Sequence, residues 1–338
     1  MSARARRLFL AALVVALLAV RAAASAHATL EGTSPQRGAT VKEEPEAVAF
    51  RFSEPVEGNF GAVRVYDADG ERVDEGDAFH PESEGKKLAV HLKPDLPDGS
   101  YTATYRVVSA DGHIVSGGYV FSIGKAGRAP EETVAELVAT GGAGTVIGIG
   151  IARGVQYAAL AVALGALAFL LLVWLPALRS LGAAGEGWDR ARRAFGRRLR
   201  LILIVASVAG SLSALAAIVF EAAQAAGVSA GSALDTTILR EELGTRFGTV
   251  WGITAPAWLL LGLVTPILRR PSPWRAAILL APLAFIALEP ALSGHPSTQS
   301  PVALLFPANV LHVVAMAIWV GGLASLVAIV PAATRELE

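Results

Sequence analysis

The chain has 338 residues, and its 29 basic and 29 acidic side chains give a formal net charge of zero, so bulk charge does not favour a nucleic-acid partner. A hydrophobic content of 53% is too high for an ordinary soluble protein, and the lack of cysteine excludes disulfides and thiolate metal sites. Because the chain has two methionines, Met1 and Met316, its six histidines and its carboxylates are the main metal ligands available, and these suit Cu(II), Zn or Ni.

Residues 1–26 have the layout of a secretory signal peptide, with three arginines, an apolar run over residues 8–20 and small residues at 24–26. Cleavage after Ala26 makes His27 the mature N-terminus, where its α-amine and imidazole can chelate one metal ion together. Cleavage elsewhere, for instance after Ala24, leaves His27 as a surface residue, and both readings stay open.

Residues 27–124 carry charges throughout and are predicted to form an all-β aqueous domain. Apolar and polar residues alternate in short segments separated by Gly and Pro turns, at residues 48–52, 63–66, 88–92, 101–107 and 119–123. Strands at this spacing indicate a β-sandwich. His91 falls opposite the apolar face of its strand and is expected to be solvated.

Residues 125–144 form a linker by composition, and residues 145–338 are predicted to form an α-helical multi-pass membrane domain. Stretches long enough to span a bilayer lie at about residues 146–176, 201–227, 248–268, 275–292 and 304–331. Arginine-rich loops at residues 179–200 and 269–275 are expected on the cytoplasmic side of a bacterial plasma membrane. The β-domain is then extracytoplasmic, in agreement with the signal peptide.

The second metal-ligand candidate is a D-x-H pattern formed by Asp111 and His113. Residues two apart share one face of an extended strand, so both side chains can point at one metal ion. Together with His27 they offer two imidazoles, an amine and a carboxylate, a set that fits tetragonal Cu(II).

Three runs of residues in the β-domain resemble CopC-type copper-binding proteins: 27–38 (HATLEGTSPQRG), 50–54 (FRFSE) and 105–113 (YRVVSADGH). The resemblance implies a Greek-key sandwich or barrel that binds Cu(II) through His27, Asp111 and His113. It also places Glu54 beside the site, supporting the ligands without binding copper, although a solvated strand-end carboxylate explains Glu54 equally well. Some CopC proteins have a Met-rich loop for Cu(I), but the corresponding residues 76–82 contain no Met.

The helical half resembles CopD-type membrane proteins at residues 292–295 (LSGH), 309–312 (NVLH) and 317–323 (AIWVGGL). The family usually has Asp where this chain has Asn309, which weakens a proton-coupling role for that position. CopD-type proteins also continue through more membrane helices, so the chain, which ends at Glu338, is expected to be a fragment or a short variant. Gly321 and Gly322 are expected to allow close helix packing.

Helical spacing places Asn309, His312 and Met316 on one face of the last span, and His295 at the outer end of the preceding one. These residues form a candidate membrane copper path, with Met316 suited to Cu(I). Interhelical hydrogen bonds by Asn309 and His312, with Met316 in packing, are the equally weighted alternative. Arg153 is expected to snorkel or to pair with an acidic group such as Glu221.

The sequence thus favours a non-enzymatic protein that binds Cu(II) outside the membrane and delivers copper to its membrane domain for uptake or homeostasis. Its predicted partners are copper and the lipid bilayer, with no nucleic acid, and the sequence identifies no protein partner. One alternative is a membrane-tethered copper buffer or sensor without transport. A copper-brace monooxygenase also uses an N-terminal histidine, but Asp111 as a third ligand and the membrane half argue against it.

Overall fold

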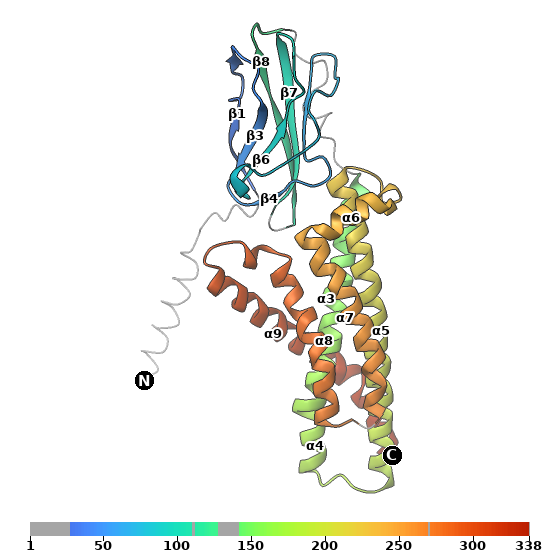
Figure 1. Ribbon diagram of the computed structural model, residues 1–338. Helices are drawn as coiled ribbons and strands as arrows, with labels where there is room; N and C mark the ends of the chain where they lie inside the picture. Colours follow the sequence, from blue (N-terminus) through green and yellow to red (C-terminus); the bar gives the residue numbers. More distant parts are fainter. Residues whose placement is uncertain (1–27, 110–111, 128–141, 270, 338) are drawn as a thin grey trace, which may run out of the picture.

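The computed structural model describes residues 28–109, 112–127, 142–269 and 271–337. It shows a β-domain stacked on one end of a bundle of long helices (Figure 1). The predicted signal peptide, His27, Asp111 and most of the predicted linker lie outside the described residues. The predicted fold class, a β-sandwich followed by a multi-pass helical domain, is confirmed.

The β-domain consists of two sheets packed face to face. Its strands are β1 (Leu30–Ser34), β2 (Thr40–Val41), β3 (Ala47–Phe52), β4 (Val56–Glu57), β5 (Val63–Tyr66), β6 (Lys87–His91), β7 (Gly99–Ser109) and β8 (Ile114–Ile123). One sheet has the order β1-β3-β6, and the other has the order β2-β8-β7-β4, with β5 also pairing with β7. The long β7–β8 hairpin runs the length of the domain and turns beside the helices (Figure 1).

The alternation in the sequence decides which side chains fill the space between the sheets. Phe50 and Phe52 are buried on β3, and the rings of Tyr105 and Tyr119 pack edge-on against them. Burial of each large apolar side chain contributes about 1.5–3 kcal/mol. The sandwich therefore has a core of its own.

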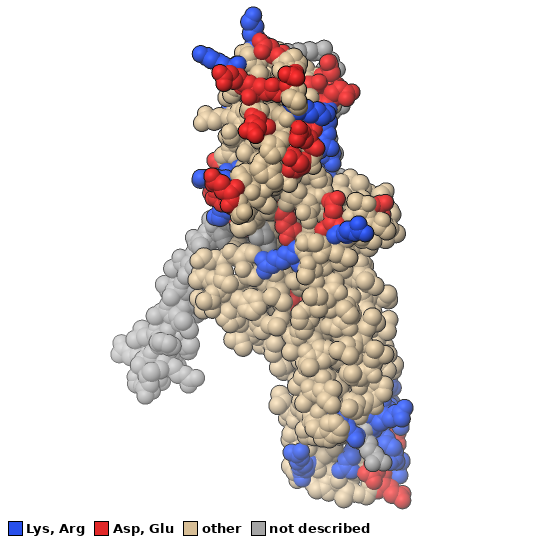
Figure 2. Space-filling view, viewed as in Figure 1, with Lys and Arg blue, Asp and Glu red and all other residues tan. Residues whose placement is uncertain are grey.

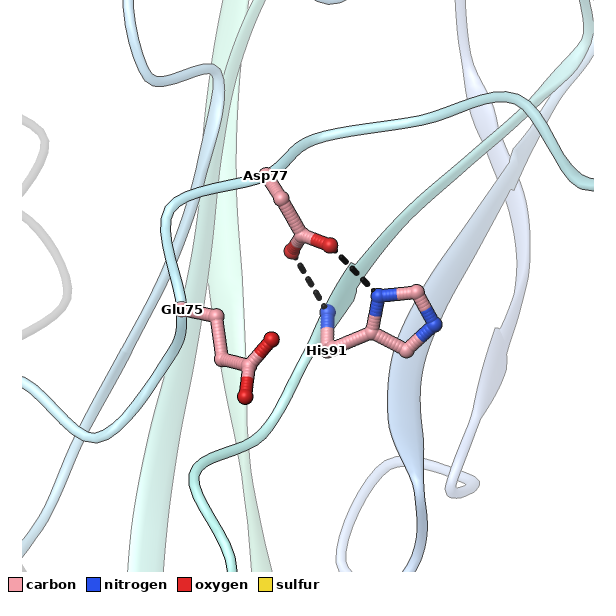
Figure 3. Close-up of side chains that lie close together, drawn as sticks. All are labelled: Glu75, Asp77 and His91. Carbon is pink, nitrogen blue, oxygen red and sulfur yellow. Dashed lines mark hydrogen bonds and ion pairs between the residues drawn. The ribbon is translucent and has the colours of Figure 1, made fainter.

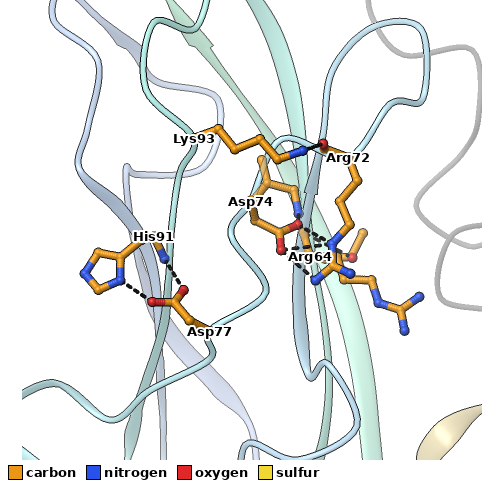
Figure 4. Close-up of polar contacts among 8 residues, drawn as sticks. Arg64, Arg72, Asp74, Asp77, His91 and Lys93 are labelled. Atoms are coloured by element: carbon orange, nitrogen blue, oxygen red, sulfur yellow. Dashed lines mark hydrogen bonds and ion pairs between the residues drawn. The ribbon is translucent and has the colours of Figure 1, made fainter.

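One carboxylate inside the β-domain is compensated locally. Asp74 is buried, and its carboxylate accepts a hydrogen bond from the Val65 N–H at 2.8 Å. It also forms an ion pair with Arg72, whose Nη2 lies 2.7 Å from Asp74 Oδ1 (Figure 4). A buried carboxylate is tolerated when its oxygens are paired in this way. The contacts fix the segment after β5 against the sheet.

The helical half consists of α3 (Ala143–Phe169), α4 (Leu175–Ser180), α5 (Glu186–Ala226), α6 (Thr236–Gly244), α7 (Arg246–Val264), α8 (Pro273–Leu292), α9 (Val302–Ala328) and α10 (Val330–Thr334). A π-helical turn, Leu170–Trp174, joins α3 to α4. Within the described residues, five helical segments are long and apolar enough to cross a membrane: 144–180, 186–226, 246–269, 273–292 and 302–337. Each of the five predicted spans corresponds to one of these helical segments.

The predicted arginine-rich loop at residues 179–200 is wrong for most of its length, because α5 begins at Glu186. Ala191, Phe195 and Leu199 recur every four residues and are buried, whereas Arg197 between them is 62% exposed. This spacing forms an apolar stripe on one helix face, and the arginines occupy the other faces. The basic segment is an extension of the second span beyond its apolar part.

Charge is distributed unevenly along the molecule (Figure 2). Acidic and basic side chains cover the β-domain, basic side chains gather at the far end of the helices, and a broad band between them is almost free of charge. Such a band is what a bilayer core requires of the surface that faces it.

The backbones of α3 and α9 approach each other closely where the two helices cross. A Cβ on Gly321 would lie 1.9 Å from the Ala161 carbonyl oxygen, and one on Gly165 would lie 2.4 Å from the Gly321 Cα. A Cβ on Gly322 would meet no atom within 4 Å. The expected close packing is thus present at Gly321 and absent at Gly322.

Candidate functional site

Of the three predicted Cu(II) ligands, the structure describes His113, which lies at the end of the β-domain nearest the helices (Figure 1). His113 directly precedes β8, and across the connection between β7 and β8 the Ser109 N–H donates to the His113 carbonyl oxygen at 2.8 Å. Gly112 adopts φ +79°, a conformation that favours glycine. This turn leaves the His113 side chain exposed at the tip of the hairpin.

Glu54 and the start of the described chain reach the same end. Val56 on β4 pairs with Ser109 on β7, so Glu54 lies two residues beyond the last pair, toward the His113 turn. The Thr29 N–H donates to Ser53 Oγ at 3.0 Å, and the Ser53 N–H donates to the Thr29 carbonyl oxygen at 2.9 Å. The segment that directly follows His27 in the chain is therefore fixed beside Glu54.

This end of the β-domain rests on the helical half. The His113 and His295 rings stack with their centroids 5.8 Å apart and their planes 24° apart. His295 belongs to a short 3₁₀ turn, η5 (His295–Ser297), directly after α8. Beside it, a Cβ on Gly112 would lie within 4 Å of Phe247, the Ser293 carbonyl oxygen and the Arg153 guanidinium.

Three polar contacts support this docking. The Phe60 N–H donates to Glu241 Oε2 at 2.7 Å, and Asn59 Nδ2 donates to the Glu241 carbonyl oxygen at 3.2 Å. The Arg246 N–H donates to Glu57 Oε1 at 2.8 Å. The loop before β5 is thereby joined to α6 and to the first turn of α7.

Arg246 also holds the segment that carries His295. Its guanidinium Nη2 donates to the Leu292 carbonyl oxygen and to Ser297 Oγ, on either side of His295. Because the Arg246 backbone binds Glu57 of the β-domain, one residue links the sandwich to the His295 turn. Hydrogen bonds of Arg246 therefore connect the β-domain to the segment that carries His295.

A cavity of about 320 Å³ lies between the two halves; we call it the interface cavity. Its lining residues are Gly112, His113, Ile114, Val146, Ile149, Arg153, Glu221 and Gln224. Arg153 Nη2 lies 3.9 Å from Glu221 Oε2, whose side chain is 3% exposed. The expected Arg153–Glu221 pair is thus formed, and it lies in the same cavity as His113.

A second cavity, of about 510 Å³, lies among α3, α8 and α9; we call it the helix cavity. Its lining residues are Tyr157, Ala158, Leu160, Ala161, Pro290, Asn309, His312, Val313, Met316, Ala317 and Val320. Asn309, His312 and Met316 therefore share one cavity, as their spacing predicts. His295 lies outside this lining and contacts the interface side instead.

Sequence reasoning did not single out two carboxylates at the interface, the buried Glu242 and the partly buried Glu57. Glu242 on α6 is fully buried, and this burial, together with the nearby charge of Glu221, raises its pKa to about 8. Burial also raises the pKa of Glu57. Neither residue has a sequence signal, because docking of the β-domain on α6 and α7 creates the burial.

The His91 side chain is 37% exposed, and it also makes two side-chain contacts. Its ring stacks on Phe79, and its Nδ1 lies 2.6 Å from Asp77 Oδ2 (Figure 3). One ligand atom each of Glu75, Asp77 and His91 lie within 4.8 Å of one another. Both carboxylates are exposed, and the Asp77 hydrogen bonds to the His91 ring and N–H account for the arrangement.

Comparison with known families assigns both halves. A profile of the CopC domain matches residues 30–124, and a profile of the copper resistance protein D-like N-terminal domain matches residues 145–302. The chain thus consists of a CopC domain followed by a CopD-like N-terminal domain. Both resemblances seen in the sequence are confirmed, and the five long apolar helices of the described residues indicate a multi-pass membrane protein.

Two relatives cover different parts of this CopC–CopD chain. Copper transport protein CutJ of Bacillus subtilis is 32% identical over 317 residues, which are 92% of this chain and 55% of CutJ. Protein YobA of Escherichia coli K12 is 36% identical over 122 residues, 36% of this chain and 97% of YobA. The chain thus spans about half the length of CutJ and nearly all of YobA.

Two solved structures are also similar to the β-domain of the CopC–CopD chain. CopC from Methylosinus trichosporium OB3b is 34% identical and covers 32% of this chain and 98% of its own, with a TM-score of 0.27. PcoC, a methionine-rich copper resistance protein from Escherichia coli, is 27% identical, and the match covers 29% of this chain and 99% of PcoC, with a TM-score of 0.26.

Proposed function

We propose that the β-domain binds Cu(II) on the extracytoplasmic side of the plasma membrane and delivers copper to the helical half for uptake. The observation that carries this proposal is the stacking of His113 on His295. A predicted copper ligand of the outer domain thereby touches a predicted path residue of the membrane domain. Copper is the cargo in this scheme and no resident cofactor is invoked.

His27, Asp111 and His113 are the ligands we propose for Cu(II), with Glu54 beside them. The support is that His113, Glu54 and the segment after His27 meet at one end of the sandwich. Imidazole, amine and carboxylate form a nitrogen-rich set that suits tetragonal Cu(II). We place the domain boundaries as the sequence predicts, with the copper-binding domain at residues 27–124 and the membrane domain at residues 145–338.

The proposed orientation rests on charge. The helix ends farthest from the β-domain carry the arginines of α5 and of the segment between α7 and α8 (Figure 2). Basic residues favour the cytoplasmic side, so the β-domain and the histidine pair lie on the opposite side. Copper then arrives at the end of the helices where His113 and His295 meet.

Beyond His295, we propose that copper enters the helix cavity, where Asn309, His312 and Met316 converge. Met316 lies one helical turn beyond His312 along α9. Its thioether is the ligand type that Cu(I) prefers, so the deeper position suits Cu(I). Polar groups at this depth are costly in a bilayer and typically mark a transport path.

The test is copper accumulation in cells that express the full chain or its variants. His312→Ala and Met316→Leu should lower uptake at least about tenfold if the cavity ligands carry copper. Cu(II) binding by the β-domain should remain intact, and His91→Ala, away from the path, serves as the control. Wild-type uptake by both cavity variants, correctly inserted, would overturn transport through the helices.

That result would leave a membrane-tethered copper buffer or sensor. Oxygen consumption by the purified protein with copper and a reductant tests the monooxygenase alternative. We expect no consumption above that of the His113→Ala variant.

A further inference from the structure

The two cavities are stacked along one face of α3. Val146, Ile149 and Arg153 line the interface cavity, whereas Tyr157 and Leu160 line the helix cavity. These positions follow one another at intervals of three or four residues, the spacing of a single helix face. Arg153 is the last α3 residue that lines the interface cavity, and Tyr157 is the first α3 residue that lines the helix cavity. The two residues are about one helical turn, or about 6 Å, apart along α3.

Arg153 is held at this junction from several sides. Its guanidinium lies 3.9 Å from the buried Glu221 carboxylate on α5 and 5.3 Å from the centroid of the Phe247 ring on α7. It also lies against the Gly112 turn that presents His113. The side chain is 27% exposed, so its charge is only partly screened by solvent.

The charges on the two sides of the junction differ. The interface cavity contains one cationic and one carboxylate side chain, Arg153 and Glu221. The helix cavity has a mostly apolar lining, and its polar lining residues are Tyr157, Asn309 and His312. Its lining residues include no Asp, Glu, Lys or Arg. A copper ion that moves along this face of α3 from the interface cavity to the helix cavity passes the positive charge of Arg153. Besides Glu221, the buried carboxylate of Glu289 on α8 also lies within electrostatic reach of Arg153.

We propose that Arg153 is a charge filter between the interface cavity and the helix cavity, and that Glu221 offsets its charge enough for copper to pass. Repulsion between like charges increases as the surroundings become less polar, so an unpaired Arg153 excludes cations from the helices. Paired with Glu221, it excludes the cations that the path histidines do not bind. This inference rests on the proposed function, because the filter acts on copper moving between the cavities.

The charge-filter role and a purely structural ion pair predict different effects of Arg153→Gln on metal uptake. If the pair only holds the helices together, Arg153→Gln and Glu221→Gln both remove it and both lower uptake. If Arg153 is a filter, Glu221→Gln removes its ion-pair partner, reduces the compensation of its charge and lowers uptake, whereas Arg153→Gln removes the barrier. The double variant should then resemble Arg153→Gln.

The experiment measures copper and zinc accumulation in cells that express the full chain. We expect Glu221→Gln to lower copper uptake at least about tenfold, and Arg153→Gln to raise zinc entry to a comparable extent. Arg153→Lys keeps the charge and should exclude zinc as the wild type does. The matched control is Arg190→Gln, because Arg190 also lies 3.9 Å from a carboxylate, that of Glu336, at the other end of the helices.

A chemical version of the test separates charge from folding. The chain has no cysteine, so Arg153→Cys creates a single reactive thiol. Reaction with a cationic aminoethyl methanethiosulfonate should restore the exclusion of zinc in protein that has already folded, whereas the neutral methyl reagent should not. Equal effects of the two reagents would overturn the filter.

The outcomes also separate this inference from the proposed function. Equal losses of uptake in both single Gln variants, or wild-type zinc exclusion in Arg153→Gln, overturn the filter even if His312→Ala abolishes copper uptake. Wild-type copper uptake in His312→Ala and Met316→Leu instead removes the proposed path itself.

Discussion

His113 of the β-domain and His295 of the helical half lie ring against ring, with centroids 5.8 Å apart. Each belongs to a different family domain, and each sits on a turn fixed by hydrogen bonds, His113 by Ser109 and His295 through Arg246. The contact joins the proposed metal-capturing end of the sandwich to the mouth of the helices. The two residues should therefore be separable by experiment.

His113→Ala should weaken Cu(II) binding and copper uptake together, because it removes a proposed ligand. His295→Ala should leave Cu(II) binding unchanged and slow uptake, because it removes the acceptor alone. Electron paramagnetic resonance of the purified protein and copper accumulation in cells measure the two properties. Unchanged nitrogen coupling in His113→Ala would show that this residue is not a ligand.

Addition of one glycine before His27 should weaken Cu(II) binding more than about 100-fold. The α-amine becomes an amide and no longer binds the metal, and changes merely around a ligand already cost about 10–100-fold. Mass spectrometry of the exported protein should first identify His27 as the mature N-terminus. A different mature N-terminus would remove the amine from the proposed site.

Gly321→Ala should destabilise the helical half by about 1–3 kcal/mol, because the new Cβ overlaps the Ala161 carbonyl oxygen of α3. Gly322→Ala is the matched control, since its Cβ meets no atom within 4 Å and alanine is the better helix former. Thermal unfolding of the full chain in detergent measures both. Equal midpoints for the two variants would contradict the α3–α9 crossing described above.

Asp77→Asn should lower the pKa of His91 toward its ordinary value of 6.5. The hydrogen bond that the His91 ring donates to the Asp77 carboxylate raises the pKa of His91, and the same bond lowers the pKa of Asp77. NMR of histidine-labelled full chain in detergent, titrated against pH, gives the value directly. A His91 pKa that does not move would mean that the Asp77–His91 hydrogen bond is absent in solution.

The same pair makes a pH-dependent contribution to stability. The His91 part is fully present below pH 6.5 and is lost as the pH rises through the raised pKa of the folded state. The Asp77 part is present above 3.8 and is lost as the pH falls through the lowered pKa. The side chains are 37% and 44% exposed, so solvent screens the pair, and the change in unfolding midpoint between wild type and Asp77→Asn should be small. It should be largest between the lowered pKa of Asp77 and the raised pKa of His91.

The sequence by itself determined the two kinds of environment in this protein and the main elements within them. Alternation at residues 48–52 and 88–92 is enough to predict buried strand faces, because side chains of a strand point to opposite sides in turn. The five spans follow from apolar length, because a bilayer leaves no other partner for the backbone. The sequence also brings Asn309, His312 and Met316 together, since helical spacing is local.

Tertiary structure alone decided the relationships between distant segments. The contact of His113 with His295, the burial of Glu242, the partial burial of Glu57, and the difference between Gly321 and Gly322 depend on how separate elements pack. Local periodicity carries no information about such packing, because it specifies which face of an element is apolar and not what covers that face. The interface cavity, which Arg153 lines, also depends on this packing, because its lining residues come from both the sandwich and the helices.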